Sequence, residues 1–422
     1  MENLYVYADF DFLPKAEKIG VLSCQQVRGK DHFTFTFSDE WLSNHGDTLL
    51  SGDIMNVKGV QHPRQGQSVF GFVGDSFPDR WGRLLLDRRE RLAAQEERRP
   101  VKLLSNYDYL FGIEDFTRMG GIRYSTQEGG SFINSEKTYC VPPLENLSAL
   151  CNACAEIEWA EERGELPQER WLNLLVDPGS SLGGARPKAN VVDKDGKLYV
   201  AKFPSRMDTD NLELIEHFSH LMAAKAGIDT AHTQVIGISR NKDVLLSERF
   251  DRTADGRRIH FASAMALLGL TDGSGAGTGN GYIDMVDFIV KNCTDVQNNL
   301  RELFRRVAFN ILYGNTDDHF RNHGFLLTRK GWTLAPAYDI NPSGKKHQCL
   351  LINENTEVSD IHVLLDSCES YMLERKEAKG IIDEVSAALK DWRSVAQANH
   401  IPVKVPERWM TQALAEVTGL TT

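Results

Sequence analysis

The segment NTDDHFRN, residues 315–322, carries acidic and amide side chains at a spacing that suits phosphoryl transfer. Four residues separate Asp317 from Asn322, as in the D-x-x-x-x-N loop of protein kinases. In that loop the aspartate accepts the proton of the substrate hydroxyl, and the asparagine binds Mg²⁺. The spacing favours Asp317 over Asp318 as the base. Asp339, in APAYDINPS, follows a predicted hairpin and stands where a kinase has its second metal-binding residue.

A glycine-rich stretch and a lysine precede that segment. Residues 177–192 read DPGSSLGGARPKANVV, and Lys202 lies in the apolar strand VAKF. An unpaired ammonium is costly to bury, so Lys202 requires an acidic partner, and Glu216 on the following helix is the best candidate. Glycine-rich loop, strand lysine, helix glutamate, base and metal ligands thus follow one another in the order found in kinases.

The acidic pair also has other interpretations. Asp317, Asp318 and the adjacent His319 are side chains that bind metal in some hydrolases, and two adjacent acids also occur in turns that cap helices. The order in which Asn322 and Asp339 follow favours the kinase interpretation.

The predicted elements carry these residues. Two strands joined by the turn 193–196 carry Lys202, and two more are expected around the turn RNKD, 240–243. A helix is predicted from Asp210, whose spacing to Glu213 suits a capping box, to Gly227. Apolar residues from Leu300 to Leu312 predict a buried helix that ends at Gly314 and delivers the acidic segment.

Upstream, the first 40 residues predict strands, and helical spacing recurs over 79–94 and 144–159. We expect an α+β fold with a bilobal protein-kinase-like core and an extra N-terminal α/β subdomain. The predicted parts are the N-terminal subdomain, 1–165, a sheet-rich lobe with the glycine-rich loop, 166–252, and a helical lobe with the catalytic and metal-binding segments, 253–422.

The motifs SSLGGARPK, VAKF, LLSERFDR, NTDDHFRN and PAYDINPS, with FGFVGDSFPDRWGR nearer the N-terminus, resemble those of the HipA family. HipA proteins are bacterial serine/threonine kinases, the toxin halves of toxin–antitoxin pairs. The resemblance implies that Asp317 is the base, that Asn322 and Asp339 bind Mg²⁺, and that Lys202 contacts the phosphates of ATP. It implies further nucleotide-binding residues: Ser181, Gly183, Gly184, Lys188, Glu216, Glu248 and Phe250.

The family also regulates itself by phosphorylating a serine in the glycine-rich loop, which then leaves the nucleotide site. Ser181 is the closest match, and Ser180 leaves the choice open. A phosphoserine adds about −1.5 to −2 charges and would repel the phosphates of ATP. The alternative is that both serines only cap a turn. Arg186 and Pro187 replace acidic and amide residues of the most studied loop; proline stiffens the backbone, and Arg186 is expected to assist with phosphate.

The composition indicates which binding partners and which cellular compartment to expect. A net charge of −11 disfavours extended contact with DNA. The chain has no run of about 20 apolar residues and no leader-like start, and its seven cysteines are scattered. We therefore expect a cytoplasmic protein that does not bind membranes.

The resemblance implies a HipB-like DNA-binding antitoxin, contact with DNA only through the antitoxin complex, and a protein substrate from the translation machinery, an aminoacyl-tRNA synthetase. Two other functions stay open. One is a weakly active subunit that serves mainly as an antitoxin-binding corepressor. The other is a small-molecule phosphotransferase.

Cys151 and Cys154 are expected on a helical core face rather than at a zinc site, because structural zinc needs four ligands.

Overall fold

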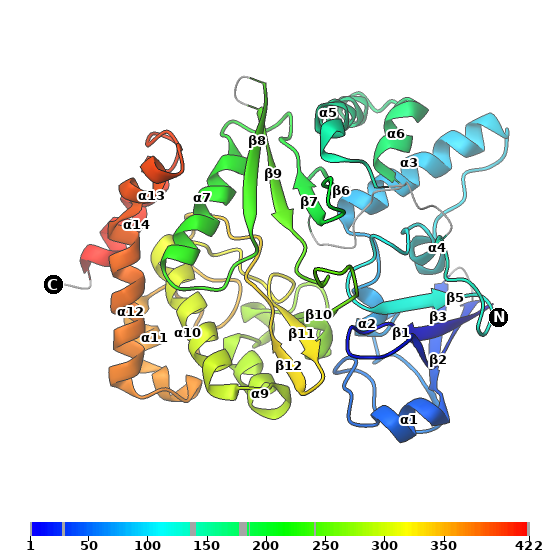
Figure 1. Cartoon of the computed structure of the whole chain (residues 1–422), viewed down its shortest axis with the longest axis horizontal. Helices are drawn as coiled ribbons and strands as arrows, with labels where there is room; N and C mark the ends of the chain where they lie inside the picture. The colour runs from blue at the N-terminus through cyan, green and yellow to red at the C-terminus, as the bar shows by residue number, and fades with distance from the viewer. Residues whose placement is uncertain are drawn as a thin grey trace. The chain divides into compact units, whose positions relative to one another are not determined.

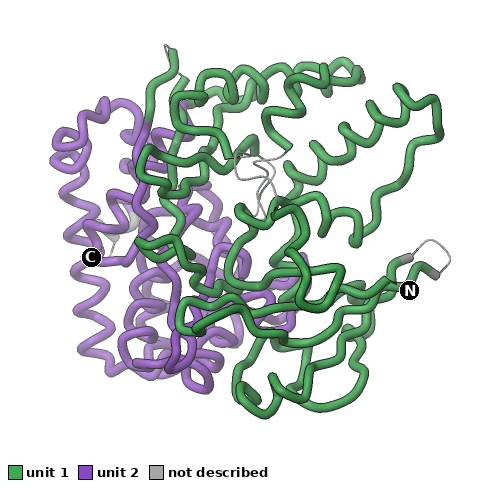
Figure 2. The backbone as a smooth tube through the Cα atoms, turned by 45° about the vertical axis from the view of Figure 1, so that its right-hand side comes forward, with its two compact units in different colours: residues 1–210, 236–262 green, residues 211–235, 263–422 purple. Residues whose placement is uncertain are grey.

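The computed structural model describes residues 2–27, 30–135, 141–176, 184, 186–239 and 242–419. Two compact units, coloured separately in Figure 2, divide the chain: Met1–Asp210 with Ile236–Ala262, and Asn211–Val235 with Ser263–Thr422. The domain boundaries near 165 and 252 stay predictions. Within the described ranges, no helix is long and apolar enough to cross a membrane.

The first unit begins with an antiparallel sheet in the order β4-β3-β2-β1-β5 (Figure 1). Phe33, Phe35 and Phe37 of β3 are all buried, in agreement with the alternating pattern HFTFTFS. The strands are β1 (Glu2–Ala8), β2 (Glu17–Val27), β3 (Lys30–Phe37), β4 (Val60–Gln61) and β5 (Ile122–Ser125), with helices α1 (Asp39–His45), α2 (Gly71–Gly74), α3 (Arg80–Glu96) and α4 (Asn106–Phe111).

A second sheet of this unit has the order β6-β7-β9-β8. Alternate residues of β6 and β7 pack into a buried cluster with α3, α5 and α6. Cys151 and Cys154 lie on α5 inside this cluster, as expected for a core face. The elements are η1 (Leu144–Asn146), α5 (Leu147–Glu162), α6 (Glu169–Val176), β6 (Lys188–Val192), β7 (Leu198–Lys202), β8 (Thr233–Ser239), which crosses the unit boundary, and β9 (Lys242–Glu248).

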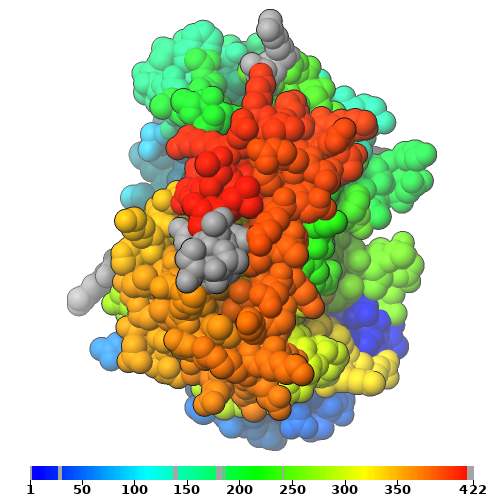
Figure 3. All heavy atoms as spheres, turned by 90° about the vertical axis from the view of Figure 1, so that its left-hand side faces the viewer, coloured from blue at the N-terminus to red at the C-terminus, as the bar shows by residue number. Residues whose placement is uncertain are grey.

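The second unit is mainly helical, and α10 (Val296–Tyr313) lies at its centre, in contact with α9, α11, α12 and α14. The helices after residue 360 form one face of this unit, orange and red in Figure 3. The other elements are α7 (Leu212–Lys225), α8 (Ala264–Leu267), η2 (Ala276–Thr278), α9 (Tyr282–Asn292), β11 (Gly324–Thr328), β12 (Gly331–Leu334), α11 (Ile361–Asp366), η3 (Cys368–Tyr371), α12 (Arg375–Lys390), α13 (Trp392–Ala398) and α14 (Glu407–Gly419); β10 (His260–Ser263) crosses the unit boundary.

One predicted detail of α7 is wrong. The side chain of Asn211 accepts the N-cap hydrogen bond, from the N–H of Leu214 at 3.1 Å, so the helix does not begin with the capping box expected from Asp210 and Glu213. Asparagine and aspartate cap helices equally well, and the sequence contains both at this point. The helix starts one residue later than the spacing suggested.

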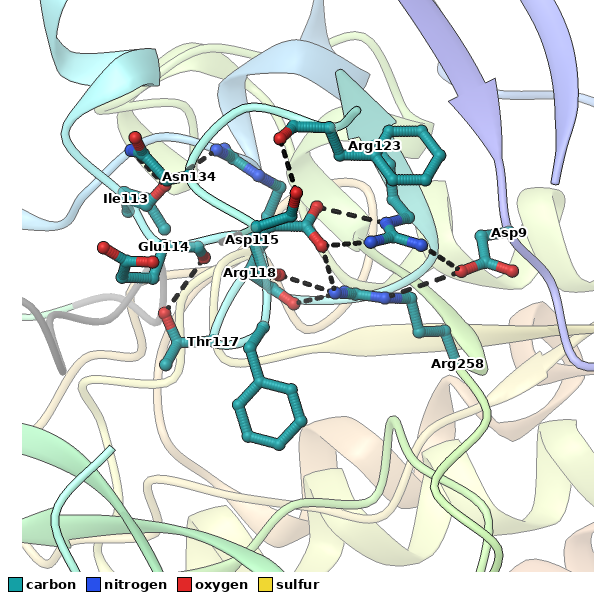
Figure 4. A network of polar contacts seen from close by, with 12 residues as sticks. Asp9, Ile113, Glu114, Asp115, Thr117, Arg118, Arg123, Asn134 and Arg258 are labelled. Atoms are coloured by element: carbon teal, nitrogen blue, oxygen red, sulfur yellow. Dashed lines mark hydrogen bonds and ion pairs between the residues drawn. The ribbon is translucent and has the colours of Figure 1, made fainter. Parts of the chain in front are cut away.

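Two buried carboxylate–arginine clusters tie distant parts of the first unit together, and Figure 4 shows the first. Arg123 binds Asp115, and its Nη1 donates to Asp9 Oδ2 at 2.9 Å. Arg258 donates to the main-chain oxygen of Asp115 at 2.5 Å. Burial by itself raises the pKa of Asp115, but Arg123 and Arg258 outweigh burial and hold the pKa below its usual range.

The second cluster lies directly after β9. The fully buried Asp251 carboxylate accepts from Arg249 (2.6 and 2.8 Å), Arg252 (2.6 Å) and the N–H of Gly120 (2.7 Å). Arg249 also donates to the main-chain oxygen of Thr117 at 2.6 Å. Because β9 ends at Glu248, a residue predicted to contact nucleotide, this cluster fixes the backbone next to that position.

We predict that Asp251→Asn lowers the free energy of unfolding by about 3–5 kcal/mol, because it leaves two buried guanidinium groups without their carboxylate. Urea unfolding of the full chain measures this. Asp255→Asn, on the exposed loop four residues later, is the control, and its midpoint should not move. Equal midpoints for both variants would contradict the assignment of Asp251.

Candidate active site

The segment with the predicted base lies between α10 and β11 of the second unit. Gly314, with φ of 83°, ends α10 as the sequence predicted. The main-chain N–H of Ser343 donates to the oxygen of Gly314 at 2.9 Å, and the N–H of Thr316 donates to Ser343 Oγ at 3.1 Å. These bonds hold residues 314–317 beside the segment that begins with Asp339.

Asp317 and Asp318 have opposite environments. The Asp317 side chain is exposed, whereas the residue Asp318 is only 5% exposed. Asp318 Oδ2 accepts hydrogen bonds of 2.7 Å from three donors, Tyr282 Oη, Asn310 Nδ2 and His323 Nε2. A carboxylate held in this way anchors the loop, and a substrate hydroxyl can reach only its exposed neighbour.

Asn322 and Asp339 supply the oxygen ligands that Mg²⁺ prefers. Asn322 Nδ2 donates to the main-chain oxygen of Asp317 at 3.2 Å, so its Oδ1 is the atom suited to a metal. Asp339 has a φ of 57°, a left-handed conformation that is uncommon outside glycine and concentrates at functional sites. The hydroxyl of Tyr338 donates to the main-chain oxygen of Arg321 at 2.6 Å and joins the two segments.

The described residues contain no group of three histidine, cysteine, aspartate or glutamate side chains able to hold a metal ion. An Asn–Asp pair nevertheless fits Mg²⁺, because this ion commonly takes only one or two carboxylates from the protein and its other ligands from substrate phosphates and water. The donor set at Asn322 and Asp339 therefore suits a metal that is bound together with a nucleotide.

Sequence reasoning missed Cys349. Its thiol lies 3.7 Å from Asp317 Oδ1, and its main-chain N–H donates to the oxygen of Thr316 at 3.1 Å. Burial raises the pKa of the thiol, and the negative charge of Asp317 adds to that rise. The thiol is therefore a hydrogen donor to Asp317. No local sequence signal links two residues 32 positions apart.

The predicted lysine and glutamate partners belong to different units. Lys202 ends β7 in the first unit, and Glu216 lies on α7 in the second. Glu216 is buried, and its Oε1 lies 3.9 Å from His220 Nε2, one helical turn later. The pairing of Lys202 with Glu216 stays a prediction.

The glycine-rich loop is described only in part, because Ser180, Ser181 and Gly183 lie outside the described residues. Gly184 has a φ of 117°, in the left-handed region that favours glycine. Arg186 forms a two-pronged ion pair with Asp208, at 2.6 and 2.7 Å, so the guanidinium expected to assist with phosphate is committed to a carboxylate. Lys188 is buried and paired with Asp79 at 2.9 Å.

Glu248 and Phe250 flank the buried Arg249. The register pairs Glu248 with Tyr199 and Lys202 with Leu245, so the side chains of Glu248 and Lys202 point to opposite faces of the sheet. Glu248 Oε1 accepts from Lys197 at 2.9 Å. A nucleotide on the Lys202 face would therefore meet Glu248 through its main chain. The Phe250 ring packs 5.9 Å from that of Phe261.

We predict that Asp318→Asn lowers the free energy of unfolding by about 3 kcal/mol at neutral pH. Burial by itself raises the pKa of Asp318, but His323 and Tyr282 outweigh burial and hold the pKa below its usual range. The carboxylate therefore stabilises the fold above the unfolded-state pKa, and this stabilisation is lost as the pH falls.

Urea unfolding between pH 3 and pH 8 checks this. The difference in the free energy of unfolding between wild type and Asp318→Asn should become smaller below about pH 4. Asp317→Asn is the matched control, because its carboxylate is exposed, and its free energy should stay within about 0.5 kcal/mol of wild type. A gap that does not change with pH would contradict the charged role of Asp318.

Comparison with known proteins places this arrangement in context. A family model described as the HipA-like C-terminal domain matches residues 180–392. A putative kinase of Haemophilus influenzae is 26% identical over 198 residues, which cover 42% of this chain and 57% of that protein. The serine/threonine-protein kinase toxin HipA of Shewanella oneidensis is 24% identical over 210 residues, 44% of this chain and 47% of that protein. The chain thus spans about half the length of the curated relatives it matches.

A solved structure shows the fold over a longer range. The complex of HipA, HipB and operator DNA from Shewanella oneidensis contains a chain that matches 98% of this one, with 96% of its own length covered, a TM-score of 0.65 and 18% identity. Both chains therefore share a fold with a protein-kinase-like core, as expected from the sequence. Since the matched domain spans half of the chain and carries the Asp317–Asn322 and Asp339 segments, this protein belongs to the HipA family.

Proposed function

We propose that this chain is an ATP-dependent serine/threonine protein kinase, a HipA-like toxin that acts on a protein of the translation machinery. The observation that carries the proposal is that two adjacent aspartates have opposite environments and therefore suit different roles. Asp318 is buried as an anchor, and Asp317 beside it is exposed on the same loop as Asn322. A metal-binding role for the Asp317–Asp318–His319 run is disfavoured, because Asp318 already accepts three hydrogen bonds.

In the proposed reaction, Asp317 accepts the proton of a serine or threonine hydroxyl as its oxygen attacks the γ-phosphorus of ATP. A bond forms between that oxygen and phosphorus, and the bond from phosphorus to ADP breaks. Asn322 and Asp339 would hold Mg²⁺, which when bound offsets the charge of the phosphate oxygens. The Cys349 thiol donates to the Asp317 carboxylate, and the Asn322 side-chain amide donates to the main-chain oxygen of Asp317, so both hold Asp317 in place.

The substrate and the partners are inferred from relatives. A HipA chain in a complex with HipB and operator DNA shares this fold. We infer a HipB-like antitoxin that brings the complex to DNA, and an aminoacyl-tRNA synthetase as the phosphorylated protein. The net charge of −11 agrees with DNA contact through the antitoxin rather than through this chain. ATP and Mg²⁺ are the proposed cofactors, and the cytoplasm is the proposed compartment.

Autophosphorylation of Ser181 or Ser180 is the proposed regulation. The ion pair of Arg186 with Asp208 is compatible with it, because this pair anchors the C-terminal end of the loop and leaves the two serines on the part of the loop that precedes the anchor. The corepressor alternative is weaker here, because both Asp317 and Asn322 are present. A small-molecule phosphotransferase would use the same residues, and metabolite acceptors tested beside protein acceptors distinguish it.

We predict that Asp317→Asn lowers the rate of phosphate transfer from ATP by about 10²–10⁴-fold, the usual contribution of a general base. Transfer of labelled phosphate to protein measures this, at saturating ATP. Affinity for Mg-ATP should stay within twofold of wild type, which shows that the variant is folded. Glu161→Gln, far from this loop in the sequence, is the control and should leave the rate unchanged. Undiminished transfer by Asp317→Asn would rule out its role as base.

We also predict that incubation with Mg-ATP places phosphate on Ser181 or Ser180, and that Asp317→Asn abolishes this modification. Mass mapping of the full chain identifies the site. The single variants Ser180→Ala and Ser181→Ala decide which serine is used. A phosphate found only outside residues 177–192 would overturn the proposed regulation.

A further inference from the structure

We propose that Asp79, at the start of α3, is a positioning residue for the nucleotide site. It would act through Lys188, by holding the Lys188 ammonium at the end of the glycine-rich loop. This inference rests on the proposed function, because it assigns a second cation of the same phosphate-binding region. Asp79 lies 109 residues before Lys188. It falls within the motif FGFVGDSFPDRWGR, but the family resemblance assigned it no role in nucleotide binding.

The pair is buried to an unusual degree. Asp79 Oδ2 lies 2.9 Å from Lys188 Nζ, and the two side chains are 1% and 3% exposed. Asp79 Oδ1 is also committed, since it caps α3 by accepting from the N–H of Gly82 at 2.7 Å. Burial raises the pKa of Asp79, and the Lys188 ammonium and the Gly82 N–H oppose that rise. Helix capping alone needs no partner for the second oxygen.

The register of β6 and β7 places two lysines opposite each other, which explains why a negative charge is favourable beside them. Lys188 of β6 stands directly opposite Lys202 of β7. Residues directly opposite each other in an antiparallel pair lie on the same face with Cβ atoms about 4.5–5.5 Å apart, and like charges there repel. The adjacent pair, Ala189 and Ala201, lies on the other face, in the buried cluster with α3, α5 and α6. Asp79 thus lowers the net charge of the lysine pair by one.

Lys188 also marks the point where the loop enters the sheet. A Cβ added to Gly184 would lie 2.9 Å from Lys188 Nζ, so the ammonium lies against the backbone of this glycine. The main-chain N–H of Phe203 donates to the oxygen of Pro187 at 3.0 Å, which extends the β6–β7 pairing by one residue. Asp79 therefore fixes an ammonium that touches the loop end, on the sheet face that carries Lys202.

Three variants separate positioning from simple stabilisation. Asp79→Asn removes the charge and keeps the cap, because asparagine caps helices as well as aspartate. Lys188→Met removes the ammonium. The double variant Asp79→Asn/Lys188→Met removes both charges of the buried pair and should recover much of the stability that either single variant loses. The matched control is Glu161→Gln, which breaks the ion pair of α3 with α5 through Arg88 and leaves the lysine face untouched.

The readouts on the full chain are the urea midpoint and the dissociation constant for Mg-ATP by calorimetry. We expect Asp79→Asn to weaken Mg-ATP binding about tenfold. The double variant should also bind Mg-ATP weakly, although its urea midpoint recovers. Glu161→Gln should bind within twofold of wild type. A double variant that binds Mg-ATP like wild type would overturn the inference, because the pair would then only stabilise the fold.

The outcome is separable from that of the kinase proposal. If the wild type binds Mg-ATP but transfers no phosphate to any protein, the proposed function fails, and the affinities of the Asp79 variants still decide this inference. If the wild type does not bind Mg-ATP, both fail together. Unchanged affinity in Asp79→Asn, with normal phosphate transfer by the wild type, overturns the inference alone.

Discussion

The proposed chemistry depends on one buried carboxylate, that of Asp318. Three donors from α9, α10 and the loop itself hold it at 2.7 Å. Because a buried charge is tolerated only when it is fully hydrogen-bonded, this arrangement allows one position for the loop. The exposed carboxylate of Asp317 and the amide of Asn322 are then placed by the backbone, with little freedom of their own.

Buried carboxylates that are paired with cations also fix the backbone of the first unit, at several places. Asp115, Asp251 and Asp79 are buried, and each is bound by at least one arginine or lysine. Asp251 also accepts from the main-chain N–H of Gly120, which is 131 residues away in the sequence. These pairs give little net stability compared with apolar packing, but breaking one of them is costly. They determine where the ends of β9 and β6 lie, and both ends carry residues of the proposed nucleotide site.

Much of the fold was predictable from local patterns. The strands β6, β7 and β9, the hairpin of β11 and β12, and the end of α10 at Gly314 agree with the sequence analysis, since alternation, helical spacing and glycine are local signals. The start of α7 was misplaced by one residue, because Asp210 and Asn211 are equally good caps. The preference for Asp317 over Asp318 came from spacing, and the difference in their burial supports it.

The contacts of the site were not predictable in the same way. The sequence suggested phosphate as a partner of Arg186 and nucleotide as a partner of Lys188, but it did not indicate the carboxylates that these two side chains bind, Asp208 and Asp79. A side chain's partner is decided by which carboxylate the fold brings within about 3 Å, and sequence separation does not encode that distance. Cys349 beside Asp317 is a further case.

The sequence by itself determined the family resemblance, the order of the chemical groups and the kinds of elements that carry them, because these depend on residue type and short-range spacing. The tertiary structure alone decided which of two adjacent acids is exposed, which cations are already neutralised, and which distant residues share a buried charge. Burial and long-range charge pairing arise only when the chain packs, so they belong to the folded molecule and not to any one segment.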